Sequence, residues 1–195
     1  MSIEQTTDIT TLEQEYCGKK FIHRKSKNSQ LLIVLNTHNQ GERYFGLKQI
    51  SEGIQDIDLL FLVDPNNKYY LDQDEGQLYK DIIQSVIKEY DVEKVSIFGA
   101  SMAGYAALHF GMLLSLNVIA INPQICLESA SKLAWPDLRK SLSNLESRVD
   151  LASLIKKEYL TQSLYLVFGK HRLDSQACKE FQEIDLPEAS YTLRI

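Results

Sequence analysis

The stretch KVSIFGASMAGYAALHF, residues 94–110, decides the fold prediction for this chain. A short run of β-branched and apolar residues ends at Gly99, and Ser101 stands two positions later. Small residues follow and lead into a helix-forming segment. The pattern G-x-S-x-[GA], filled by residues 99–103, is typical of a sharp turn from a buried strand into a helix that exposes a serine side chain. Ser101 is therefore a candidate nucleophile.

Apolar runs without polar alternation recur on both sides of this stretch. We expect buried strands at 31–35, 58–63, 94–98, 117–121 and 164–168, a weak strand at 20–24 and a final strand at 191–195. Spacings of three and four between apolar residues predict a helix at 75–90. Helices are also expected at 44–52, 101–116 and 176–183. Strands that are apolar throughout are covered by helices on both faces, so the pattern predicts an α/β fold with a doubly wound, mostly parallel sheet.

The chain of 195 residues is expected to form a single domain, residues 1–195. Residues 1–17 are expected to be a tail or a short peripheral element, and the more polar helical segment 124–162 is a possible cap or lid. Ligand sites in doubly wound sheets form at the carboxyl ends of the strands. The loops 36–41, 64–70, 99–104, 122–126 and 169–175 are therefore where a site is expected.

Two nucleotide-binding motifs compete for the same turn. Gly99 and Gly104 have the spacing of a phosphate-binding loop, but Tyr105 stands where its lysine is required and Ala106 replaces its hydroxyl residue. The dinucleotide motif G-x-G-x-x-G also fails, because Ser101 occupies the position of its second glycine. The serine interpretation fits better, because such a turn strains the nucleophile and tolerates only small residues two positions to either side.

Composition excludes several other classes of protein. The net charge of −5 and the scattered basic residues argue against nucleic acid as a partner. The three cysteines Cys17, Cys126 and Cys178 show no C-x-x-C spacing, which predicts neither a metal site nor a redox pair and fits reduced thiols in the cytoplasm. We expect no secretory signal and no membrane span, because no apolar run approaches the roughly 20 residues that a span requires.

The chain resembles the α/β-hydrolase fold family over roughly residues 30–195. It is also similar, more loosely, to small serine-dependent enzymes of bacterial surface-polysaccharide pathways, which include capsule O-acetyltransferases. The motifs that carry this resemblance are VDPNNKYYLD at 63–72, GASMAGYAAL at 99–108 and INPQ at 121–124. Two oxyanion donors are then expected: the N–H of Met102 at the helix N-terminus, and a backbone N–H near Thr37 or His38 in the loop after the strand 31–35.

The resemblance also implies an acid and a histidine base. The acid is expected after the strand 164–168, where Asp174 is the only carboxylate of the loop; the alternative role for Asp174 is to cap the helix that begins near Gln176. The family's histidine lies beyond the last strand, and the chain is expected to end at that strand. The base is then a histidine in polypeptide beyond residue 195, or His38 or His171 substitutes for it, or the protein is a non-catalytic relative that binds a ligand or a partner.

The function expected from these residues is acyl transfer through an acyl-enzyme on Ser101. The reaction is ester hydrolysis or transfer of an acyl group such as acetyl to a carbohydrate hydroxyl in surface-polysaccharide metabolism. The expected substrate is a small-molecule ester or carbohydrate. No cofactor or metal is expected, although acetyl-CoA is a possible acyl donor for a transferase.

Overall fold

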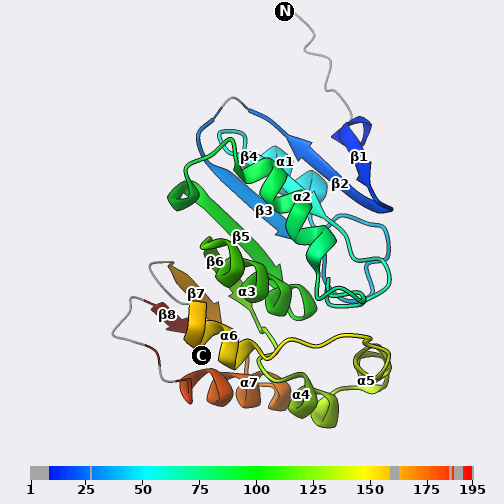
Figure 1. Cartoon of the computed structure of the whole chain (residues 1–195), viewed down its shortest axis with the longest axis vertical. Helices are drawn as coiled ribbons and strands as arrows, with labels where there is room; N and C mark the ends of the chain where they lie inside the picture. The colour runs from blue at the N-terminus through cyan, green and yellow to red at the C-terminus, as the bar shows by residue number, and fades with distance from the viewer. Residues whose placement is uncertain (1–8, 27, 159–162, 185, 187–190, 195) are drawn as a thin grey trace, which may run out of the picture.

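The computed structural model describes residues 9–26, 28–158, 163–184, 186 and 191–194. Its centre is a single sheet of strand order β1-β2-β4-β3-β5-β6-β7-β8 (Figure 1). The strands are β1 (Glu13–Tyr16), β2 (Lys19–Arg24), β3 (Leu31–Leu35), β4 (Asp58–Leu62), β5 (Val95–Ala100), β6 (Asn117–Ile121), β7 (Leu164–Val167) and β8 (Tyr191–Arg194). The pairs β1–β2 and β2–β4 are antiparallel, and every pair from β4 to β8 is parallel.

Helices lie on both faces of this sheet (Figure 1). The helices are α1 (Leu47–Gly53), α2 (Gln77–Ile87), α3 (Met102–Leu114), α4 (Leu127–Leu133), α5 (Pro136–Ser143), α6 (Leu151–Glu158) and α7 (Arg172–Gln182), with short 3₁₀ turns at Ile9–Leu12 and Val92–Lys94. The larger core joins α2, α3, α6 and α7 to one face, and a smaller core lies on the other face beside α1. The fold is therefore the α/β, doubly wound, mostly parallel sheet that the apolar runs predict.

Helix α3 lies closest to the sheet, and residues 102–112 are all buried. Gly111 permits this contact, because a Cβ atom at that position would lie 2.2 Å from Cγ2 of Val118 on β6. The strands and α3 together fix the segment that carries Ser101 in the middle of the fold, at the carboxyl ends of β5 and β6.

The expected strands 31–35 and 117–121 agree with β3 and β6 to the residue, and those at 20–24, 58–63, 94–98 and 164–168 differ by one or two residues at an end. The expected strand 191–195 is present as β8 over Tyr191–Arg194, and its last residue lies outside the described part of the chain. Of residues 1–17, expected to be a tail or a short peripheral element, residues 1–8 lie outside the described ranges. Glu13–Tyr16 forms the edge strand β1 and joins β2 through a turn at Cys17 and Gly18, both with positive φ. This strand was missed because its side chains are all exposed and carry no apolar signal.

Helix α7 begins four residues before the expected Gln176. His171 is its N-cap, and the ring nitrogen Nδ1 accepts a hydrogen bond from the N–H of Leu173 at 3.3 Å. The alternative that Asp174 caps this helix is therefore wrong, since Asp174 lies inside the first turn. The segment 124–162 contains three short helices, α4, α5 and α6, within its described residues. No helix in the described ranges is long and apolar enough to cross a membrane.

Candidate active site

Ser101 lies between β5 and α3 with φ 54° and ψ −118°, a conformation that residues other than glycine rarely adopt. Its N–H donates to the carbonyl of Ile121 at 2.8 Å, and its carbonyl accepts from the N–H of Tyr105 at 3.1 Å. Gly99 is required for the same turn, because a Cβ atom there would lie 2.0 Å from the carbonyl oxygen of Ala103. The strained turn expected around the serine is present.

The first turn of α3 supplies hydrogen-bond donors beside Ser101. Tyr105 is the first residue whose N–H is bonded within the turn, so the N–H groups of Met102, Ala103 and Gly104 have no acceptor inside the helix. The positive end of the helix dipole lies at the same place. This end of α3 is suited to stabilise negative charge that develops next to the serine, as the role predicted for Met102 requires.

The loop after β3 is fixed against the turn that carries Ser101. The hydroxyl of Thr37 donates to the carbonyl of Ala100 at 2.8 Å. Buried Asn36 accepts at Oδ1 from the N–H of Asp64 at 2.8 Å and from the hydroxyl of Tyr70 at 2.7 Å. The loop that carries the predicted second oxyanion donor is therefore tied to both β5 and the loop after β4.

The ring of His38 is directed to the segment 124–162. Its Nε2 lies 2.9 Å from the hydroxyl oxygen of Ser141 on α5, and its centroid is 6.4 Å from that of Trp135. Burial lowers the pKa of His38, which favours the neutral ring. The backbone of His38 stays a predicted oxyanion donor, while its ring connects the loop after β3 to α5.

Asp174 lies at the carboxyl end of β7. A Cβ atom on Gly169 would come within 2.9 Å of the Asp174 Oδ2 atom and 3.4 Å of the Asn122 Oδ1 atom, so both side chains lie against this glycine. Asn122 Oδ1 accepts from the N–H of Gly169 at 2.7 Å. Burial raises the pKa of Asp174, and the nearby His171 opposes that shift. Asp174 therefore lies next to the loop after β6, where a partner cation would stabilise its charge.

The described histidine rings lie elsewhere than at Ser101. His38 contacts Ser141, His171 caps α7, His23 lies 3.2 Å from the hydroxyl of Tyr90, and His109 is buried on α3. No hydrogen bond joins any of these rings to Ser101 within the residues described. His38 and His171 stay predicted substitute bases, and of the two only His171 interacts electrostatically with Asp174.

Gln124 is a site residue to which the sequence analysis gave no role, although it ends the INPQ motif and lies in the expected site loop 122–126. It is 1% exposed and donates from Nε2 to the hydroxyl oxygen of Ser101 at 3.3 Å. Its Oε1 accepts from the hydroxyl of Tyr69 at 3.2 Å. Its position in the sequence could have marked it as a site residue, because Gln124 is a polar residue that follows the apolar strand β6 at the carboxyl edge of the sheet.

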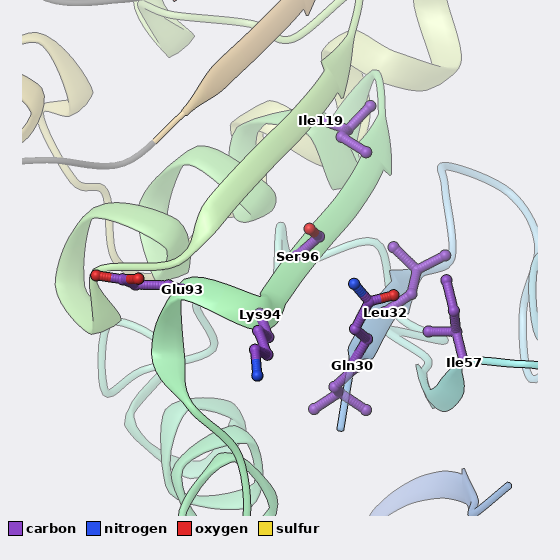
Figure 2. A pocket seen from close by; sticks show the side chains of 8 residues that line it. Gln30, Leu32, Ile57, Glu93, Lys94, Ser96 and Ile119 are labelled. Atoms are coloured by element: carbon purple, nitrogen blue, oxygen red, sulfur yellow. The ribbon is translucent and has the colours of Figure 1, made fainter. Parts of the chain in front are cut away.

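Two pockets lie at opposite edges of the sheet, and only one of them is near Ser101. One of about 370 Å³ is lined by residues 125–128, 148–150 and 152, so it begins directly after Gln124. Another of about 270 Å³ lies at the amino ends of β3 and β5, where Figure 2 shows Gln30, Glu93 and Lys94 around Ser96. The second pocket is at the opposite edge from Ser101 and is not part of the site. The described residues contain no cluster of three or more His, Cys, Asp or Glu side chains that could hold a metal ion.

Solved structures define the class of this fold. Searches against family models and against curated protein sequences gave no match. The structure is similar to an S-formylglutathione hydrolase of Agrobacterium tumefaciens, with a TM-score of 0.61 and 14% identity over 93% of this chain and 84% of that one. It is also similar to a fluorophosphonate-binding serine hydrolase of Staphylococcus aureus, with a TM-score of 0.60 and 14% identity over 90% and 83%. The chain thus has the α/β-hydrolase fold.

A higher similarity is to the capsule O-acetyltransferase of Neisseria meningitidis serogroup A. The TM-score is 0.71 at 20% identity, and the match covers 97% of this chain and 88% of that enzyme. A variant of the same enzyme was solved in complex with CoA, and it matches with a TM-score of 0.66 and 18% identity over 95% and 91%. At these identities the likeness concerns the fold.

Proposed function

We propose that the protein catalyses acyl transfer through an acyl-enzyme on Ser101. Oγ of Ser101 attacks the carbonyl carbon of an ester or thioester, and its proton passes to a base and then to the leaving group. The bond from carbon to Oγ forms as the bond to the leaving group breaks. Water or a carbohydrate hydroxyl then attacks the acyl-enzyme, which gives hydrolysis or O-acyl transfer.

The observation that carries this proposal is the backbone of Ser101. Strain at φ 54° persists only where the surrounding structure enforces it, and here Gly99, Ile121 and Tyr105 do so. Ser101 directly precedes the N–H groups of Met102 and its neighbours, which lack an acceptor inside α3 and would hold the oxyanion.

The base is proposed to be a histidine oriented by Asp174. His171 is the candidate near Asp174, and His38 is the candidate near the oxyanion loop. A histidine from polypeptide beyond residue 195 is the third alternative. These alternatives differ in their response to free imidazole, because an enzyme without a resident base is accelerated by a soluble one.

The finer proposal is O-acetylation of a carbohydrate hydroxyl in surface-polysaccharide metabolism, with acetyl-CoA as donor and no other cofactor. Similarity of the fold to a capsule O-acetyltransferase and its CoA complex supports this choice over hydrolysis. A cytoplasmic protein with access to acetyl-CoA fits the three free cysteines, Cys17, Cys126 and Cys178.

The test is the hydrolysis of p-nitrophenyl acetate with and without imidazole, combined with intact-mass detection of an acetyl adduct. We expect an adduct on the wild-type protein and none on Ser101→Ala. Loss of the adduct in His171→Ala or His38→Ala, with recovery in imidazole, would identify that residue as the base. Imidazole acceleration of the wild-type protein itself would indicate that neither histidine serves. An equal adduct on Ser101→Ala would overturn the proposal.

A non-catalytic binding protein on the same fold is the second candidate function. The observation in its favour is that no described histidine ring contacts Ser101. It predicts no acetyl adduct on Ser101, with or without imidazole, from either p-nitrophenyl acetate or acetyl-CoA. An adduct that depends on Ser101 would exclude this alternative.

A further inference from the structure

The side chain of Gln124 is hydrogen-bonded to Oγ of Ser101, the oxygen that reacts in the proposed function. Its Nε2 is 3.3 Å from Oγ of Ser101 and 3.4 Å from the carbonyl oxygen of Asn122. Its Oε1 is 3.2 Å from the hydroxyl of Tyr69. Gln124 and Tyr69 are 1% and 0% exposed, so water does not compete for these contacts.

The orientation of the amide follows from its neighbours. A backbone carbonyl is an acceptor only, so the end of the amide that faces the Asn122 carbonyl must be the NH₂ group. The same NH₂ group faces Ser101, and the oxygen is left to accept from Tyr69. The reverse orientation would place the amide oxygen against the carbonyl of Asn122. Gln124 therefore donates to Oγ of Ser101.

Tyr69 keeps the amide in this orientation. Its backbone has a positive φ of 60°, its ring packs edge-to-face on Tyr105 with centroids 5.5 Å apart, and its hydroxyl is directed at Gln124. Burial raises the pKa of Tyr69 well above its ordinary value, so the phenol stays protonated and remains a donor. A buried donor that lost its acceptor would be left unsatisfied at a cost in stability, which favours a single arrangement.

We propose that Gln124 is a catalytic residue that stabilises negative charge on Oγ of Ser101, and that Tyr69 is the positioning residue that aims it. This inference rests on the proposed function of Ser101. Charge builds up on Oγ when its proton leaves during acylation. It builds up again when an acceptor attacks the acyl carbon, the carbon–Oγ bond breaks and the electron pair returns to Oγ. An N–H group in a buried site lowers the energy of both states.

The first test replaces the amide by an apolar side chain of similar volume, Gln124→Met. Loss of one preorganised donor in an acyl-transfer site typically slows the reaction by about 10²–10³-fold. Because the bond in the resting site is 3.3 Å long, we expect the smaller effect of about 10-fold or more on both acetylation and deacetylation of Ser101. The rates are followed with p-nitrophenyl acetate and intact mass, and KM is expected to stay within about twofold.

A second variant separates a loss of stability from a loss of reaction rate. Gln124→Met leaves the hydroxyl of Tyr69 buried without its acceptor, whereas the double variant Gln124→Met/Tyr69→Phe removes both partners. We expect the double variant to fold at least as stably as Gln124→Met and to react equally slowly. Tyr69→Phe alone is expected to slow both steps about threefold or more, with no further loss in the double variant, because Tyr69 acts through Gln124.

Tyr79→Phe is the matched control for Tyr69→Phe. Tyr79 is equally buried and donates to the carbonyl of Val63 at 3.0 Å, without a contact to Gln124. Its substitution is expected to lower stability and leave the rates unchanged. The inference is overturned if Gln124→Met reacts at the wild-type rate, or if the effects of Tyr69→Phe and Gln124→Met multiply. The proposed function fails separately, if the Ser101→Ala protein is acetylated like the wild type.

Discussion

The backbone at Ser101 has a strained conformation that glycine would adopt without the same steric penalty. We predict that Ser101→Gly is more stable than Ser101→Ala by about 1 kcal/mol, because relief of a strained φ exceeds the extra chain entropy that glycine loses on folding. Both variants lack the hydroxyl, so the comparison isolates the backbone. Urea unfolding of the two proteins measures the difference, and equal stabilities would show that the turn is not strained.

Gly99 is the second residue on which the turn depends. We predict that Gly99→Ala lowers the free energy of unfolding by about 3 kcal/mol or more, because its methyl group would overlap the Ala103 carbonyl at 2.0 Å. Gly53→Ala is the control, since a Cβ atom there has nothing within 4 Å. It is expected to change stability by at most about 1 kcal/mol. Equal effects of the two substitutions would contradict the close approach at Gly99.

At the scale of elements, the loops after β3 and β4 are joined at Asp64, a residue whose carboxylate is buried. Asp64 is 1% exposed, accepts from the N–H of Tyr70 at 3.0 Å and donates its own N–H to Asn36. Burial raises the pKa of Asp64 to about 6. The stabilising contribution of the protonated group is complete below the unfolded pKa of about 3.9 and is lost as pH rises through about 6.

Asp64→Asn tests this linkage. Relative to the wild type, we predict that its free energy of unfolding improves by up to about 3 kcal/mol between pH 4 and pH 7, because asparagine has no charge to bury. Chemical unfolding at a series of pH values gives the difference between the two proteins. A difference that is constant over this range would show that the Asp64 pKa is not raised.

The sequence predicted those strands best whose burial is reflected in a run of apolar residues. LLIVL at 31–35 is apolar throughout, NVIAI at 117–121 is apolar after Asn117, and both strands match to the residue. β1 was missed because EQEY at 13–16 is exposed, and only its partner β2 defines it. The contact of Gln124 with Ser101 depends on the path of two loops, and no local pattern encodes it.

At the scale of the whole molecule, stability is unevenly distributed. Helix α5 buries only Leu138 and Leu142, whereas α3 is buried along residues 102–112 and the strands beneath it are central. We predict that amide hydrogens of α5 exchange at least about 100-fold faster than those of β5 and β6, since elements with few buried contacts open locally. Native-state hydrogen exchange measures this, and equal protection would contradict it.

The strand order β1-β2-β4-β3-β5-β6-β7-β8 brings the loops of Thr37, Ser101, Gln124 and Asp174 to one edge of the sheet. The most direct test of Ser101 as the nucleophile is a fluorophosphonate probe, with the modified peptide identified by mass spectrometry. We predict a single phosphonylated residue, Ser101, and no labelling of a folded Ser101→Ala protein. Labelling at another residue, or equal labelling of both proteins, would contradict a nucleophilic role for Ser101.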